Sequence, residues 1–282
     1  MRFISAVDEM ERAIGDLKSS KKTIGFVPTM GCLHEGHMAL VRESGRRAGA
    51  TVVSIFVNPA QFGPKEDLNA YPRDLKRDSA LLEKEDVAIL FCPGVQEMYP
   101  HGYKTYVEVH DLQDRLCGRS RPGHFRGVST VVLKLFEIIQ PDVAFFGQKD
   151  AQQVVIIKKM VEDLNLRVAI EALPTVREPD GLALSSRNAY LNPDERKAAL
   201  VLYQGLKTVQ KLFSQGERQA DLLLGEIRSA IAREPLARID YVEIVNPRTL
   251  EPIFCIENQA LIALAVFIGK TRLIDNVNLS TG

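Results

Sequence analysis

Two histidines, His34 and His37, stand three residues apart in the stretch PTMGCLHEGH at positions 28–37. An apolar run at 23–27 precedes it and an amphipathic run at 38–47 follows it, which predicts a strand, a glycine-bearing turn and a helix. Residues three apart share one helix face. A helix N-terminus presents unpaired N–H groups and a positive dipole end, so the place suits a polyphosphate. The imidazoles would meet charge that develops at phosphorus.

The same spacing of histidines also occurs in surface pairs and in half of a metal site. A metal would need further protein ligands. Glu35 points off the shared face, however, and His124 is distant in the sequence. We therefore predict a nucleotide site at His34 and His37, and no metal centre built from protein ligands.

A second polar cluster, FVNPAQFG at 56–63, follows another apolar run. Its amides, Asn58 and Gln61, both donate and accept, which suits the hydroxyls and carboxylate of a small polar acid. A plain turn is the alternative, because Asn-Pro often begins a loop. The charged residues that follow, at 65–68 and 73–74, are either a mobile lid or a solvated surface.

A third cluster, GQKDAQQ at 147–153, also follows an apolar run. Gly147 would let the backbone approach a ligand closely. Lys149 supplies a point charge for phosphate, and Asp150 could accept from ribose hydroxyls while capping a helix. Gln153 lies one turn beyond Asp150 on the same side. An ordinary capped helix start is the alternative.

Two further segments carry positive charge. Ser185, Ser186 and Arg187 combine two hydroxyls with a guanidinium, a set that grips phosphate. The segment CGRSRPGHFRG at 117–127 is basic and glycine-rich. It would either hold an acidic substrate or act as a structural loop that closes onto the following helix, and the residues leave both open.

Strand-like and helix-like runs alternate through the first two-thirds of the chain. The expected strands are 23–27, 51–57, 87–91, 142–146 and 167–172, and the expected helices are 35–48, 71–85, 127–139 and 151–164. This alternation predicts an α/β fold with a Rossmann-like, doubly wound parallel sheet. Ligands bind such sheets at the carboxyl ends of the strands, where the polar clusters are expected to converge.

The pattern changes after about residue 184. Helices are expected at 192–213 and 218–232, and strands at 239–245, 260–268 and 272–277. We therefore predict a nucleotide-binding domain at 1–184 and a smaller α+β domain at 185–282. Residues 185–188 would then lie at a hinge.

Bulk composition excludes several classes of protein. The 36 Lys and Arg balance the 36 Asp and Glu, which argues against a protein that mainly grips nucleic acid. The four cysteines form no CxxC pair, as in a reduced cytosolic protein. The N-terminal stretch contains acidic residues and lacks a long apolar run, so it does not resemble a signal peptide. The longest apolar run, 260–268, is too short to span a bilayer. We expect a soluble cytoplasmic protein.

Five segments together resemble the pantothenate synthetase family. They are PTMG and LHEGH at 28–37, FVNP and QFG at 56–63, RPGHFRGV at 121–128, FGQKD and QQ at 146–153, and LSSRN at 184–188. Their order and spacing match across nearly the whole chain. The resemblance implies a ligase that joins pantoate to β-alanine and cleaves ATP to AMP and pyrophosphate through a pantoyl adenylate. It also implies a need for Mg²⁺ and a homodimer. Because an acyl adenylate hydrolyses readily, we expect the C-terminal domain to close over the site and exclude water.

The resemblance further implies roles for individual residues. His34, His37 and Lys149 would be catalytic, with His37 the candidate for proton transfer. Gln61, Gln153 and Asn58 would bind substrate. The ATP-binding residues would be Pro28, Met30, Gly31, Cys32, Leu33, His34, Glu35, Gly36, His37, Gly147, Gln148, Lys149, Asp150, Val176, Leu184, Ser185, Ser186 and Arg187.

Three rival functions stay open at this point. One is a nucleotidyltransferase that stops after it transfers AMP to a phosphorylated substrate. Another is a fragment of an aminoacyl-tRNA synthetase, although the zero net charge and the lack of an RNA-binding module weigh against it. A third is a non-catalytic protein that binds nucleotide or metal through His34 and His37.

Overall fold

The computed structural model describes residues 1–64 and 66–281. The chain divides into two compact units. The first unit comprises residues 1–113, 121–147 and 156–174, and the second comprises 114–120, 148–155 and 175–282. The units change over at residue 175, and two short segments from earlier in the chain belong to the second. The domain boundary expected between residues 184 and 185 stays a prediction.

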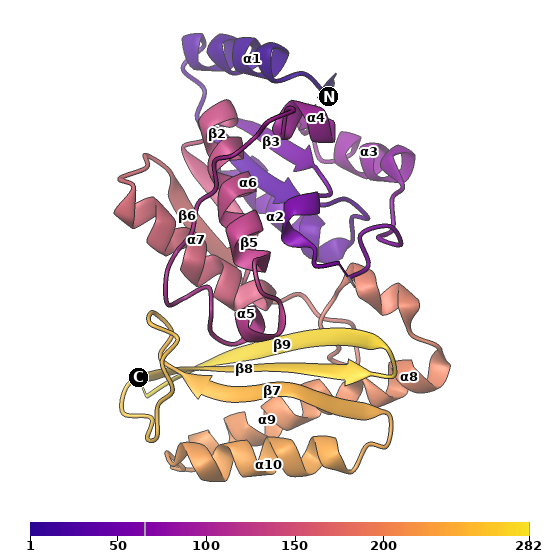
Figure 1. The fold of residues 1–282 in the computed structure, drawn as a ribbon, viewed down its shortest axis with the longest axis vertical. Helices are drawn as coiled ribbons and strands as arrows, with labels where there is room; N and C mark the ends of the chain where they lie inside the picture. Colours follow the sequence, from indigo (N-terminus) through magenta and orange to yellow (C-terminus); the bar gives the residue numbers. More distant parts are fainter. Residues whose placement is uncertain (65, 282) are drawn as a thin grey trace. The chain divides into compact units, whose positions relative to one another are not determined.

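The first unit is built on a six-stranded sheet in the order β1-β4-β3-β2-β5-β6, and all its strand pairs are parallel. The strands are β1 (Arg2–Ile4), β2 (Ile24–Thr29), β3 (Ala50–Ile55), β4 (Ile89–Phe91), β5 (Val143–Gly147) and β6 (Ala169–Leu173). β2 and β3 are nearly continuous apolar runs because both faces of a parallel sheet are covered. This sheet confirms the predicted doubly wound fold (Figure 1).

Helices cover both faces of this sheet. They are α1 (Val7–Ser19), α2 (Glu35–Arg47), α3 (Leu75–Glu83), α4 (Val95–Met98), α6 (His124–Ile139) and the later part of α7 (Ala151–Asp163). α2 packs on β2, β3 and β5, whereas α1 and α6 contact each other. Right-handed crossovers place α2 and α3 on one face and α1 and α6 on the other. Leu33, Met38, Val41 and Leu82 pack in the core beside β2 and β3.

The sequence pattern located most of these elements, but it missed β1, α1 and the short α4. β1 has only three residues, too few to show alternation. α3 begins at Leu75, later than expected, because the Asp74 side chain accepts the N–H of Arg77 and caps the helix there. α6 begins at His124, before the expected Gly127.

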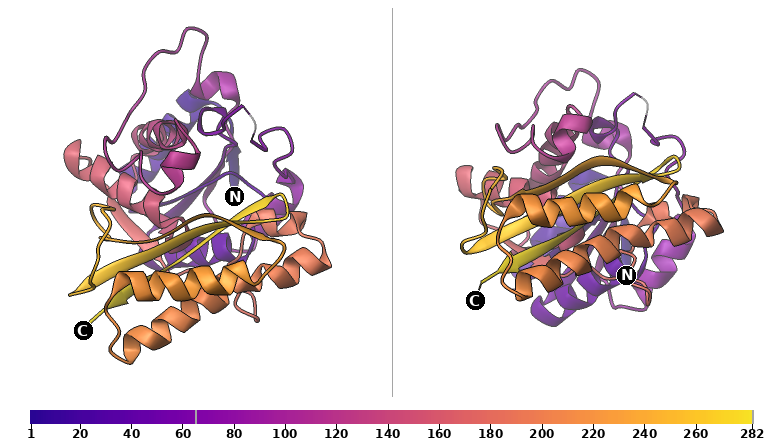
Figure 2. Two further views of the ribbon diagram at one scale, coloured as in Figure 1. Left: turned by 60° about the horizontal axis from the view of Figure 1, so that its bottom comes forward. Right: turned by 90° about the horizontal axis from the view of Figure 1, so that it is seen from below.

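The second unit contains an antiparallel sheet of β7 (Ala237–Val245), β8 (Gln259–Ile268) and β9 (Thr271–Ser280). One face is covered by α9 (Leu200–Ser214) and α10 (Ala220–Ala232), as Figure 2 shows. Leu206, Leu223, Ile227 and Ile262 lie in the core formed there. The expected helix 192–213 is two helices, α8 (Pro193–Ala198) and α9, although Ala199 between them keeps a helical conformation. The unit also includes the short α5 (Cys117–Ser120).

Within the described residues, no helix is long and apolar enough to cross a membrane.

Candidate active site

The strand order determines at which edge of the sheet the predicted polar clusters begin. The chain runs from β2 through β3 to β4 on one side, and β5 and β6 lie on the other, so the order reverses between β2 and β5. Doubly wound sheets bind ligands beyond the carboxyl ends of the strands at such a reversal. Residues 30–37 follow the end of β2, and Gln148 follows the end of β5. Asn58 and Gln61 come soon after the end of β3.

The turn after β2 is held by a buried carboxylate. Gly31 and Cys32 have positive φ values of 83° and 51°, which make a tight left-handed turn. The Asp78 side chain on α3 accepts the N–H of Cys32 at 2.7 Å and that of Leu33 at 2.8 Å. Asp78 is only 1% exposed. Burial raises its pKa above the ordinary value, and the two N–H donors oppose that shift.

Sequence analysis missed Asp78. The signal in the sequence is an acidic residue one helical turn before Leu82, which is fully buried. A charged residue on the apolar stripe of a helix generally has a specific partner. Nothing local in the sequence identifies that partner as the turn after β2.

Replacing Asp78 by alanine is expected to destabilise the protein and to weaken binding of the nucleotide that is predicted to lie at this turn. It would leave the N–H groups of Cys32 and Leu33 without their acceptor, at a cost of about 1–3 kcal/mol for each buried group. Denaturant unfolding would measure the change in the free energy of unfolding. Asp74→Ala, which removes only the cap of α3, is the control and should cost about 1 kcal/mol. Equal effects of the two variants would contradict this role for Asp78.

The two histidines at the start of α2 have defined hydrogen-bonding partners. The N–H of Gly36 donates to Nδ1 of His34 at 3.2 Å, and the N–H of His34 donates to Nδ1 of His37 at 3.3 Å. The ring centroids are 4.0 Å apart. A nitrogen that accepts a hydrogen bond carries no proton, so we assign each neutral ring its proton at Nε2. Both rings therefore provide an Nε2–H group that can donate to a phosphate oxygen.

The side chains of Asn58 and Gln61 bond to each other across the short 3-10 helix η1 (Pro59–Gln61). Asn58 is 1% exposed. Its Nδ2 donates to Oε1 of Gln61 and to the carbonyl of Gly127, each at 3.0 Å. Its Oδ1 accepts from the N–H of Ala60 at 3.2 Å and from the Tyr99 hydroxyl at 2.8 Å. An amide has no further hydrogen-bonding capacity, so Asn58 is placed to orient Gln61. Its predicted contact with substrate stays a prediction.

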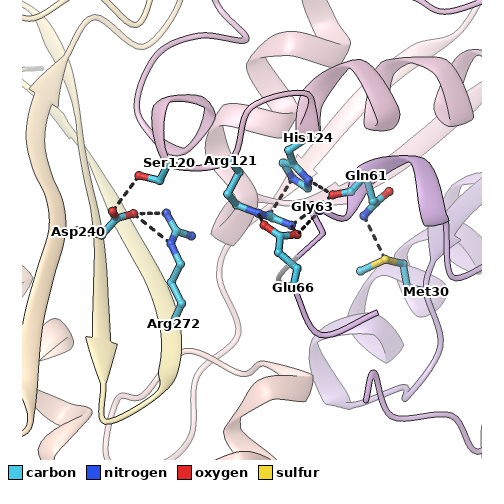
Figure 3. A network of polar contacts seen from close by, with 9 residues as sticks. All are labelled: Met30, Gln61, Gly63, Glu66, Ser120, Arg121, His124, Asp240 and Arg272. Atoms are coloured by element: carbon cyan, nitrogen blue, oxygen red, sulfur yellow. Dashed lines mark hydrogen bonds and ion pairs between the residues drawn. The ribbon is translucent and has the colours of Figure 1, made fainter. Parts of the chain in front are cut away.

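Gln61 connects the turns that follow β2 and β3. Its Nε2 donates to the Met30 sulfur at 3.1 Å (Figure 3). The first turn of α6 packs directly on its backbone, because a Cβ at Gly127 would lie 2.2 Å from the carbonyl oxygen of Ala60 and 2.6 Å from the nitrogen of Gln61. Only glycine permits this approach of helix and turn.

Gly127→Ala is expected to destabilise the protein by about 1–3 kcal/mol or more, because the overlapping atoms are backbone and cannot rotate away. It should also raise the KM for the substrate that Gln61 is predicted to bind. Gly225→Ala in α10 is the matched control, since a methyl group there would meet nothing within 4 Å. That variant should be neutral or stabilising by up to about 1 kcal/mol. Thermal unfolding would compare the two, and equal melting temperatures would contradict the packing argument.

The segment at 117–127 contributes Arg121 and His124 to the same turn. Arg121 binds the Glu66 carboxylate through Nε at 2.6 Å and Nη2 at 2.7 Å. Burial alone would raise the pKa of Glu66, but the hydrogen bonds and charge of Arg121 lower it below the ordinary value. His124 contacts the carbonyl of Gln61. These contacts favour the structural interpretation of the segment. Lys65, within the charged run at 65–68, lies outside the described residues.

In the second unit, β9 holds the turn that carries Lys149. This turn is η2 (Gln148–Asp150). Nδ2 of Asn276 donates to the carbonyls of Gln148 and Lys149, each at 2.9 Å. Lys149 Nζ lies 3.8 Å from the Asp150 carboxylate. Asn276, which the sequence analysis missed, therefore fixes the backbone from which the Lys149 side chain extends.

Val176 and Leu184 flank an isolated antiparallel β-bridge between Arg177 and Ala183. The N–H of Leu184 donates to the carbonyl of Val176 at 3.0 Å, so these two predicted residues are neighbours. Ser185 caps η3 (Ser186–Tyr190) by accepting the N–H of Arg187 at 3.3 Å. On α7, the buried Gln152 binds the backbone of Arg115 and Cys117. Gln153 is only partly buried.

Comparison with known proteins places the chain in one family. The pantoate-beta-alanine ligase family matches residues 2–278. The chain is 56% identical to a pantothenate synthetase from Caldicellulosiruptor saccharolyticus over 98% of this chain and 99% of that protein. It is 54% identical to one from Thermotoga petrophila, over 99% and 100% of the two chains.

Solved structures agree with this match. The crystal structure of pantothenate synthetase from Thermus thermophilus superposes with a TM-score of 0.94 at 47% identity, covering 98% of this chain and 99% of that one. A pantoate-beta-alanine ligase from Francisella tularensis, complexed with beta-gamma ATP and beta-alanine, has a TM-score of 0.80 at 35% identity. That match covers 98% of this chain and 97% of the other.

Proposed function

The chain belongs to the pantoate-β-alanine ligase family and condenses pantoate with β-alanine using ATP, and we propose that it does so through a pantoyl adenylate. The observation that carries this proposal is the pair of imidazoles at the start of α2, both with Nε2 as the protonated nitrogen. A relative complexed with an ATP analogue and β-alanine supports the two ligands.

In the first step, the pantoate carboxylate attacks the α-phosphorus of ATP, an O–P bond forms, and pyrophosphate leaves. A carboxylate needs no general base, so the demand on the protein is alignment and neutralisation of charge. We assign His34 and His37 to the phosphate oxygens as Nε2–H donors. Lys149 supplies a full positive charge.

The other predicted ATP contacts are also proposals. Ser185, Ser186 and Arg187 would hold the β- and γ-phosphates. Asp150 would accept from the ribose. The remaining ATP-binding residues are proposed to line the nucleotide: Pro28, Met30, Gly31, Cys32, Leu33, Glu35, Gly36, Gly147, Gln148, Val176 and Leu184.

Gln61 and Gln153 are proposed to bind pantoate. In the second step, the β-alanine amine attacks the acyl carbon, the C–N bond forms, AMP leaves, and the nitrogen loses a proton. His37 is the candidate for that transfer by resemblance. In the tautomer set by the N–H of His34, however, its Nε2 already carries a proton. We therefore assign His37 a donor role in the first step.

Mg²⁺ is also proposed. Across residues 1–64 and 66–281, no group of three or more His, Cys, Asp or Glu is arranged to hold a metal ion. This arrangement fits Mg²⁺ that arrives bound to ATP, because Mg²⁺ is commonly held by substrate phosphates and water with few protein ligands. When bound, it would neutralise polyphosphate charge.

A homodimer and a C-terminal domain at 185–282 that closes during the reaction are further proposals. Closure would protect the adenylate from hydrolysis. Sedimentation equilibrium would test the dimer. Small-angle scattering with and without ATP and pantoate would test closure, and an unchanged radius of gyration would contradict it.

The proposed function is tested by AMP release from ATP and Mg²⁺, with pantoate and β-alanine added separately and together. Steady AMP formation that requires both, matched by pantothenate, is the expected result. Stable adenylated product without any need for amine would instead indicate a nucleotidyltransferase. ATP binding without turnover under any combination would indicate a non-catalytic protein.

A further inference from the structure

We propose that His124 is a positioning residue for Gln61: a neutral imidazole that connects the Arg121–Glu66 ion pair to the Gln61 carbonyl and thereby fixes the amide that binds substrate. This inference rests on the proposed role of Gln61 in pantoate binding. It gives a function to the basic, glycine-rich segment at 117–127, for which the sequence left two interpretations open.

The hydrogen bonds of His124 define its tautomer. Nδ1 lies 2.8 Å from the carbonyl oxygen of Gln61, which can only accept, so Nδ1 carries the proton. Nε2 lies 3.0 Å from Nη1 of Arg121, which can only donate, so Nε2 accepts. This assignment is opposite to that of His34 and His37. His124 therefore acts as a link between two fixed groups (Figure 3).

Arg121 is held firmly on its other side. Glu66 binds it through both carboxylate oxygens and also accepts the N–H of Gly63 at 3.2 Å. The side chains of Arg121 and Glu66 are 15% and 24% exposed. Bidentate arginine–carboxylate pairs that are shielded from water have a defined geometry. An acidic substrate would have to displace Glu66 to reach Arg121, which disfavours a direct substrate role for this guanidinium.

Gln61 is thereby restrained at both ends. Its side chain bonds to Asn58 and to the Met30 sulfur. Its carbonyl accepts from His124, with Arg121 Nη2 more distant at 3.4 Å. The close packing of Gly127 against the backbone of Ala60 and Gln61 restrains the same turn. Losing the His124 bond would leave the Gln61 carbonyl with only the longer Arg121 contact, so the backbone that carries the side-chain amide would be held less tightly.

The test compares two substitutions in the full chain. His124→Phe keeps a ring but removes both hydrogen bonds, whereas His124→Asn places an amide N–H near the position of Nδ1 and retains the donor to Gln61. Loss of one such bond corresponds to up to about tenfold in binding. His124→Phe is expected to raise the KM for pantoate about tenfold with little change in the KM for ATP. His124→Asn should restore it to within about threefold. His101→Phe, at an exposed histidine, is the control.

A double-mutant cycle separates positioning from general structural damage. If His124 acts through Gln61, His124→Phe should add less than about twofold to the KM for pantoate in a Gln61→Ala background. Fully multiplicative effects, or a normal KM in His124→Phe beside a raised KM in Gln61→Ala, would overturn the inference. A normal KM in Gln61→Ala would instead remove Gln61 from pantoate binding, and would so overturn the proposed role on which the inference rests. Should His124→Phe fail to fold, His124→Ala, which also removes both hydrogen bonds of the ring, takes its place in the same cycle.

Discussion

Replacing His37 by alanine is expected to slow pantoyl adenylate formation by about 100- to 1,000-fold, the usual cost of removing one donor aimed at developing charge. The ring lies 4.0 Å from that of His34, and its Nδ1 accepts the N–H of His34, which leaves Nε2 as the donor. Single-turnover formation of AMP or adenylate with saturating ATP and pantoate would measure the rate.

A matched variant separates this chemistry from folding. His37→Asn keeps an acceptor close to the position of Nδ1, so it should retain the cap on the N–H of His34 and the stability of α2. It lacks the Nε2–H group and should be about as slow as His37→Ala. Near-normal turnover in His37→Asn would show that only the cap matters, and near-normal turnover in His37→Ala would remove His37 from the chemistry.

Replacing Lys149 by alanine should lower kcat/KM for ATP by about 100-fold or more, because it removes a full charge from the proposed phosphate site. Asn276 donates to the backbone carbonyl of Lys149 and so fixes the point from which the lost side chain extends. Steady-state kinetics with ATP varied at saturating pantoate and β-alanine would measure the effect. The melting temperature should change little, since the 3.8 Å contact between the ammonium group and the half-exposed Asp150 carboxylate is a weak one.

Lys158→Ala is the control for a general change in charge, because Lys158 is an exposed residue of α7, the helix that follows the turn with Lys149. It should leave the kinetics unaltered. Equal rates for Lys149→Ala and the unmodified protein would place Lys149 outside the site. A loss confined to the KM for pantoate would mean that it binds the acid instead of the nucleotide.

The elements near the site were predictable because their signals are local. The apolar runs of β2, β3 and β5 are continuous in the sequence, and glycine or proline marks the turns after them. The strand order was not predictable from these signals. It depends on tertiary packing, as does the pairing of β1 with β4, whose register joins Arg2 to Ile89.

The support of the site was the least predictable part. Asp78 lies 46 residues from the N–H of Cys32 that it accepts, and Tyr99 lies 41 residues from Asn58. No periodicity in the sequence connects such residues. The spacing of His34 and His37 indicated their place, but not which ring nitrogen carries the proton. That depends on the backbone N–H groups that fold against them.

The most direct test of the adenylate mechanism is the exchange of labelled pyrophosphate into ATP in the presence of pantoate and Mg²⁺, with β-alanine left out. A reversible first step that forms pantoyl adenylate and pyrophosphate predicts rapid exchange that depends on pantoate and is lost in His37→Ala. No exchange until β-alanine is added, in protein that forms pantothenate normally, would contradict the two-step account.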